Sequence, residues 1–214
     1  MRTQAAVALL IAGALMGIAR APSAVSGNVV IERMEAANPA LITYRARVHV
    51  NVHMLNFPYL NPQLDGTSYF KRPARYEIVF DSVPFYMKNF SHLFADMGEP
   101  AAWERDDNVT LVGTRVESGR AMLVLRMTKK IHSDILAYTD AFVDARTYRL
   151  VRMEWHYTSG GTIAITRSYR DEHGFMLPAQ EHASIDIPHV RAVGDAVYDA
   201  YQVNVVVDNT VFSR

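Results

Sequence analysis

The stretch from Tyr44 to Met54 reads YRARVHVNVHM and alternates strictly between polar and apolar side chains. A period of two is typical of a β-strand with one solvated face and one apolar face. The apolar parity holds Tyr44, Ala46, Val48, Val50, Val52 and Met54, and the polar parity holds Arg45, Arg47, His49, Asn51 and His53. The pattern therefore predicts a strand that packs its valine side on a core and turns its histidine side to water.

The two histidines of this strand do not have the spacing of a metal site. His49 and His53 are four residues apart, which places them about 13 Å apart at about 3.3 Å per residue along a strand. Two ligands of one zinc ion must both come within about 2.1 Å of it. A strand-borne pair would need the position between them, which is Asn51. We therefore expect a solvated outer face and no metal.

Composition limits the class of protein. The chain has 214 residues, of which 50% are hydrophobic and 21% are charged, so it is long enough to bury one sizeable core. Lys plus Arg and Asp plus Glu both number 22. A chain without net positive charge has no field that attracts the phosphate backbone of DNA or RNA, so we expect no nucleic-acid partner. Cysteine is absent, which excludes disulfides and thiol catalysis.

The N-terminus has the anatomy of a secretory signal peptide. Arg2 precedes an apolar run, Ala5–Ala19, of 15 residues, which is shorter than the roughly 20 that a membrane-spanning helix needs. Ala24 and Ser26 fit the small-x-small rule for cleavage before Gly27. We predict a signal peptide over residues 1–26, one domain over 27–214 and a periplasmic location, with an uncleaved anchor as the alternative.

Most of the remaining chain is predicted to form strands that are apolar on one face. In the alternating segment Leu150–Tyr157, for example, one face carries Val151, Met153, Trp155 and Tyr157. The expected strands are Thr43–Met54, Thr67–Lys71, Arg75–Asp81, Val109–Val116, Ala121–Met127, Ile135–Val143, Leu150–Tyr157, Thr162–Arg170, Phe175–Ile187 and Tyr198–Val207. Their apolar faces must be buried in a sandwich, or in a barrel or half-barrel, and the pattern alone leaves both open.

Two segments are expected to be helical. Asn28–Ala40 places Val30, Met34 and Ala37 on one face, and Pro39 stops the helix. The segment Phe85–Pro100 has an apolar stripe at helical spacing and is expected to end at Gly98 and Pro100. The stripe consists of Met87, Phe90, Phe94 and Met97. Such a stripe is either ordinary core or a lid over an apolar cavity, because methionine and phenylalanine can repack around variable ligands.

The sequence contains no arrangement typical of an enzyme. Its eight histidines show no metal-ligand spacing, and nucleophile elbows, phosphate-binding glycine loops and dinucleotide fingerprints are absent. The triplet His132–Asp134 could take part in acid–base chemistry, but isolated polar triplets are common in loops. We therefore expect a binding protein that uses no cofactor and catalyses no reaction.

One hairpin resembles a known family. The stretch Gly66–Phe80, GTSYFKRPARYEIVF, resembles the early hairpin of the LolA-type periplasmic lipoprotein carriers, with a glycine, an aromatic strand, Lys-Arg-Pro and a second strand. The segments DARTYRLVRMEW (144–155) and YQVNVVVDNTVF (201–212) look like later strands of outer-membrane lipoprotein-sorting proteins. The resemblance implies a mainly β fold with a few short helices, in which a single curved antiparallel sheet forms an unclosed half-barrel covered by helices.

The resemblance also implies a function. The protein would be a periplasmic carrier that holds lipid or lipoprotein acyl chains for transfer between membranes, as a monomer that meets membrane-bound donor and acceptor proteins. The alternative is a periplasmic sensor or interaction protein that binds a protein partner or another lipid. Side chains that point inward from their strands would line the acyl-chain cavity. These are Tyr44, Val48, Val50, Val52, Tyr76, Ile78, Phe80, Met153 and Trp155. The lid would comprise Arg72, Met87, Phe90, Phe94 and Met97, with Arg72 bonded to the backbone of the covering loops. The helix-like segment at 85–100 departs from the family pattern, in which a turn and a strand stand there.

Overall fold

The computed structural model describes residues 26–73, 75–85, 97 and 100–213. The elements in chain order are α1 (Gly27–Glu35), β1 (Thr43–Met54), β2 (Gln63–Lys71), β3 (Arg75–Phe80), α2 (Pro100–Asp106), β4 (Asp107–Glu117), β5 (Arg120–Lys129), β6 (Leu136–Asp144), β7 (Leu150–Tyr157), β8 (Thr162–Glu172), β9 (Phe175–Ile187), β10 (Val190–Val203) and the short 3₁₀ helix η3 (Asn209–Ser213). None of the described helices is long and apolar enough to cross a membrane.

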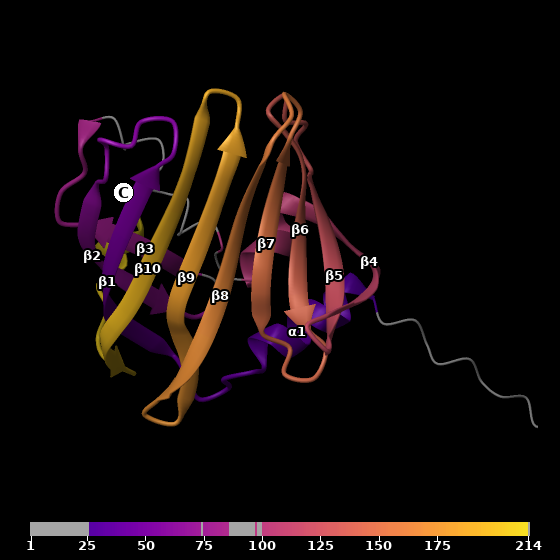
Figure 1. The fold of residues 1–214 in the computed structure, drawn as a ribbon. Coiled ribbons are helices and arrows are strands. Elements are labelled where there is room, and N and C mark those ends of the chain that lie inside the picture. The colour runs from indigo at the N-terminus through magenta and orange to yellow at the C-terminus, as the bar shows by residue number, and fades with distance from the viewer. Residues whose placement is uncertain (1–25, 74, 86–96, 98–99, 214) are drawn as a thin grey trace, which may run out of the picture.

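The strands form one curved antiparallel sheet (Figure 1). Its ten strands lie in the order β3-β2-β1-β10-β9-β8-β7-β6-β5-β4. Within the described residues, the two edge strands β3 and β4 pair with only one neighbour each, so the barrel is not closed. The mainly β, unclosed half-barrel expected for this chain is therefore confirmed, and the sandwich is excluded.

Irregular pairings help the sheet to curve. The register shifts between Leu111 and Gly113 on β4 and between Ser168 and Tyr169 on β8. An extra residue on one strand bends that strand and increases its twist. A tight approach also occurs at Gly66 on β2, where an added Cβ would lie 2.7 Å from the carbonyl oxygen of Val79 on β3. A side chain at that position would push the first hairpin apart.

The concave side of the sheet holds the core. On β1 the predicted alternation is confirmed, because the inward residues are buried: Tyr44, Ala46, Val48, Val50 and Val52. On the outer face, His49 Nδ1 lies 2.5 Å from Asp65 Oδ1, whereas His53 hydrogen-bonds to Asn61. The two histidines thus have separate partners, and no group of three potential metal ligands lies among the described residues.

The first helix is shorter than its sequence pattern predicted. α1 buries Val30, Ile31 and Met34 and packs against α2 and β4. It ends at Glu35 rather than at Ala40. The residues that follow form a turn, which suits Asn38 and Pro39 better than a continued helix does.

Most of the helix predicted at Phe85–Pro100 lies outside the described residues, and the second described helix, α2, follows it. Pro100 begins α2 instead of ending the preceding helix. Proline suits the first position of a helix because no intrahelical partner awaits its missing N–H group. The predicted lid residues Met87, Phe90 and Phe94 lie outside the described residues. Met97 is described and is fully buried.

Two strands, β2 and β10, also have bounds that differ clearly from the prediction. β2 begins at Gln63 rather than at Thr67, because the turn-like residues before Thr67 pair with β1. β10 spans Val190–Val203 rather than Tyr198–Val207. It begins earlier because it pairs with both β9 and β1, and such pairing overrides weak local propensity. It ends before Asn204, which has a positive φ of 54°.

Candidate functional site

One hollow of the half-barrel, here called the large cavity, has a volume of about 590 Å³. This volume lies within the range of about 300 to 1,000 Å³ that is usual for small-molecule sites. Its lining residues are Tyr76, Ala102, Trp103, Arg105, Asp106, Asp107, Met127, Lys129, Ser133, Ile135, Leu136, Thr139, Met153, Trp155 and Tyr157. The cavity is thus bounded by α2 on one side and by β5, β6 and β7 on the other.

Strand alternation and one helix produce the apolar lining of the large cavity. Met153 and Trp155 are two residues apart on β7 and therefore point to the same side of the sheet. Met127 on β5 is buried beside them. Trp103 of α2 is buried from the opposite side. The lining also contains charged residues near the ends of α2 and β5, among them the buried Asp107, which pairs with Lys129 at 3.1 Å. The cavity therefore combines apolar and charged side chains.

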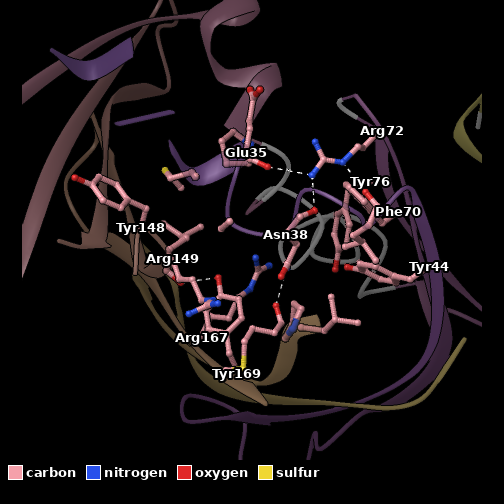
Figure 2. A pocket seen from close by; sticks show the side chains of 18 of the residues that line it. Glu35, Asn38, Tyr44, Phe70, Arg72, Tyr76, Tyr148, Arg149, Arg167 and Tyr169 are labelled. Carbon is pink, nitrogen blue, oxygen red and sulfur yellow. Dashed lines mark hydrogen bonds between the residues drawn. The ribbon is translucent and has the colours of Figure 1, made fainter. Parts of the chain in front are cut away.

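A second hollow, here called the arginine pocket, has a volume of about 120 Å³ (Figure 2). Its lining residues are Met34, Glu35, Ala37, Asn38, Leu41, Tyr44, Phe70, Arg72, Pro73, Tyr76, Pro100, Tyr148, Arg149, Leu150, Arg167, Tyr169, Met176, Leu177 and Pro178. They come from α1 and its following turn, β1, the β2–β3 hairpin, the first residue of α2, the β6–β7 turn, β8 and β9. Tyr76 lines both hollows, so the two are adjacent.

The predicted cavity residues divide between these hollows and the core. Tyr44 and Tyr76 line the arginine pocket, and Tyr76, Met153 and Trp155 line the large cavity. The others, Val48, Val50, Val52, Ile78 and Phe80, belong to the packed core and are not among the lining residues of either hollow. Binding of an acyl chain by any of these residues stays a prediction.

Arg72 ties the first hairpin to the end of α1. Its Nε donates to the carbonyl oxygen of Leu41 at 2.5 Å, and its Nη2 donates to those of Glu35 at 3.0 Å and Asn38 at 2.6 Å. The last carbonyl groups of a helix have no intrahelical partner. A cation at this end also interacts favourably with the negative end of the helix dipole. One guanidinium therefore holds the helix end and the turn that follows it.

A buried ion pair joins the neighbouring strands β8 and β9. Arg167 and Glu181 stand opposite each other in the register, with Nε and Oε1 2.6 Å apart. Their side chains are 8% and 0% exposed. The hydroxyl of Tyr198 donates to Glu181 Oε2 at 2.8 Å, and the hydroxyl of Ser68 donates to that of Tyr76 at 3.2 Å.

Burial and the charges of this network raise the pKa values of three of its members, Arg167, Tyr76 and Tyr198. Burial opposes the charge on Arg167, but Glu181 outweighs this effect, so the pKa of the Arg167 guanidinium lies well above its usual value. Burial, followed by the charge of Glu181, raises the pKa of the Tyr76 hydroxyl to about 12. The same two causes raise the pKa of Tyr198 well above its usual value. Arg167 therefore stays charged and both tyrosines stay neutral over the physiological pH range.

This buried pair was not predicted, although the sequence carries a signal for it. Arg167 occupies the same parity as Ile163 and Ile165 on β8, and Glu181 occupies that of Ala183 and Ile185 on β9. A charged residue on the inward parity of each neighbouring strand predicts a buried pair.

Known proteins resemble this chain in fold rather than in sequence. No protein-family model matches the chain, and no curated protein matches its sequence. A DUF1329 family protein from Desulfovibrio piger superposes with a TM-score of 0.66 at 10% identity, over 87% of this chain and 95% of that one. A LolA superfamily protein from Nitrosomonas europaea gives a TM-score of 0.61 at 11% identity, over 89% and 99% of the two chains. A Vibrio parahaemolyticus domain named for outer membrane lipoprotein sorting gives 0.62 at 9% identity, over 87% and 95%.

This chain has the LolA-like fold. Similarity at these identities establishes the architecture alone. For a LolA-like protein, the resemblance of the Lys71–Pro73 segment implied that Arg72 bonds to the backbone of a covering element, and three such bonds are present. Whether they hold a lid shut stays a prediction.

We expect Arg72→Leu to loosen α1 from the LolA-like half-barrel without unfolding the sheet. The substitution removes the donors of three carbonyl groups, and each one left buried and unpaired costs about 1 to 3 kcal/mol. Hydrogen exchange should therefore accelerate at the amides of α1 and residues 36–41 and change little in β7–β9. The matched control is Arg75→Leu on the same hairpin, where Arg75 is exposed and bonds to Asn209. Equal exchange in the two variants would contradict the role of Arg72 as a latch.

Proposed function

We propose that this protein is a periplasmic carrier that binds the acyl chains of lipids or lipoproteins and moves them between membranes without catalysis. The observation that carries the proposal is the large cavity of about 590 Å³ on the concave side of the half-barrel. Sequestration of an acyl chain there is favourable because each buried methylene contributes about 0.8 kcal/mol. A donor and an acceptor at the two membranes would load and unload it.

The lining of the cavity supports an apolar, flexible ligand. Met127 and Met153 are adaptable side chains that tolerate varied apolar partners. Trp103 and Trp155 present large apolar surfaces from opposite sides. Two independent considerations add to this: the apolar N-terminal run of a signal peptide, and solved structures of the same fold that are named for lipoprotein sorting or the LolA superfamily.

The two tryptophans make a direct test possible. Trp103 and Trp155 are the only tryptophans of the chain, and both line the large cavity. A long-chain alcohol brominated in mid-chain is expected to quench their fluorescence saturably, because bromine quenches only on contact. The unbrominated alcohol should restore the signal.

The control is the same titration in denaturing urea, where both tryptophans are exposed and no cavity exists. Quenching that is equally weak in the folded and unfolded protein would exclude acyl chains from the cavity. The carrier proposal would then be wrong. The neutral alcohol keeps this test independent of any headgroup charge.

A further inference from the structure

The arginine pocket carries more positive than negative charge. Its lining includes three arginines, Arg72, Arg149 and Arg167, against one carboxylate, that of Glu35. Arg167 is paired with Glu181, but Arg72 bonds only to carbonyl groups among the described residues. Arg72 lies across the pocket from Arg149 and Arg167 (Figure 2). A negatively charged group of small size would therefore be attracted into this space.

Arg149 is the least satisfied of the three. Its Nε is buried without a hydrogen-bond partner, and its guanidinium makes no ion pair among the described residues. Arg167 Nη2 is also without a partner of hydrogen-bond geometry, although it lies 2.5 Å from Glu181 Oε1. Buried N–H groups of native proteins are nearly always paired. The buried N–H group of Arg149 Nε, which lacks a partner and lines this pocket, therefore points to a ligand that accepts hydrogen bonds.

The turn that carries Arg149 is held firmly. Asp144 Oδ1 accepts from the backbone N–H groups of Arg146 at 3.0 Å and Thr147 at 2.8 Å. Tyr148 has a positive φ of 53°, and its hydroxyl accepts from Arg33 Nη1 at 3.1 Å. A non-glycine residue in this conformation persists only where its surroundings fix it, and such residues concentrate at binding sites. The backbone of the turn thus fixes the position from which Arg149 reaches the pocket.

The arginine pocket and the large cavity lie at opposite ends of the β6–β7 hairpin. Arg149 and Leu150 line the first at the hairpin turn, whereas Leu136 and Trp155 line the second near the other end. The span from Leu150 to Trp155 is five residues, or about 16 Å at about 3.3 Å each. Tyr76 adjoins both hollows. A ligand with an acidic head and an apolar tail could occupy the two together.

We propose that the arginine pocket is a headgroup subsite for anionic amphiphiles, in which Arg149 donates to a carboxylate or phosphate whose acyl chain extends into the large cavity. The planar guanidinium fork matches both anions and binds them through two parallel hydrogen bonds. This subsite rests on the proposed carrier function, because its ligand is the acyl chain assigned to the large cavity. It adds the chemical class of that ligand.

The test compares ligands that differ only in the headgroup. Dodecanoic acid, monododecyl phosphate and dodecanol displace the neutral fluorescent probe N-phenylnaphthylamine from the protein at pH 8. The wild-type protein is expected to bind the two acids about tenfold or more tighter than the alcohol, as charge-assisted hydrogen bonds require. Arg149→Met should remove most of this preference, because it weakens binding of the two acids far more than binding of dodecanol. Arg149→Lys should restore part of it.

The matched control is Arg146→Met, since Arg146 is exposed on the same turn and does not line the pocket. It should keep the full preference for acids. Equal affinity of the wild-type protein for acid and alcohol would overturn the headgroup subsite while the carrier function stands. Failure of all three ligands to bind would overturn both. Inorganic phosphate that binds alone as tightly as dodecyl phosphate would assign the pocket to a free anion, and the headgroup subsite would be wrong.

Discussion

Arg167→Met is expected to lower the free energy of unfolding by about 3 to 5 kcal/mol, the usual effect of removing one partner from a buried ion pair. The side chain of Glu181 is 0% exposed. In the variant it would keep the hydroxyl of Tyr198 as a donor but lose its cation, and a charge without a partner is costly away from water. Domains are stable by only about 5 to 15 kcal/mol. Urea denaturation monitored by circular dichroism measures the loss.

The double variant Arg167→Met/Glu181→Gln should recover most of that loss. It removes both charges, while the glutamine carbonyl still accepts from Tyr198. The matched control is Arg191→Met, which breaks an exposed pair between β10 and β9, Arg191 with Asp186 at 3.5 Å. Exposed pairs contribute at most about 1 kcal/mol. A loss for Arg167→Met that is no larger than for Arg191→Met would show that water screens the pair at Arg167.

The fold could largely be predicted from alternation because most strands are apolar on one face and polar on the other. β7 and β9 have the bounds that the sequence predicted, Leu150–Tyr157 and Phe175–Ile187. The choice between a sandwich and a half-barrel could not be made in this way. It depends on how strands pair over long distances, and only the resemblance of the Gly66–Phe80 hairpin favoured the half-barrel.

Alternation fails where the sheet bends. Val151 shares the parity of Met153 and Trp155, yet it packs against Met122, Val124 and Phe142 in a separate apolar cluster. The register of β6 and β7 shifts beside Phe142. A bulge of one residue turns the side chains beyond it to the other face, and period-two reasoning cannot place it.

The candidate site was harder to predict than the fold. The arginine pocket combines six separate stretches of the chain, so no local pattern identifies it. Arg72 was predicted from the family resemblance and Arg167 could have been predicted from parity. Arg149 lies in a turn, where neither periodicity nor a motif indicates the direction of its side chain.

Ala102→Phe is expected to lower the chain length beyond which a further methylene no longer tightens binding. Ala102 of α2 lines the large cavity, and a phenyl ring there would occupy space that terminal methylenes need. In a series of neutral alcohols, each added methylene should tighten binding to the wild-type protein about fourfold, the equivalent of about 0.8 kcal/mol. The gain stops when the cavity is full. In the variant it should stop at a chain shorter by two or more methylenes, so that the longest ligands bind more than tenfold more weakly.

Isothermal titration calorimetry across the series measures the chain length at which the gain in affinity stops, here called the break point. Thermal melting checks that the variant is folded. The control Ala101→Phe alters the neighbouring residue of α2, which is not among the lining residues. Its break point should match that of the wild-type protein. The comparison separates cavity volume from general damage to α2, because both variants add the same ring to the same helix. Identical break points in all three proteins would place the acyl chain outside the large cavity and remove the main support for a carrier.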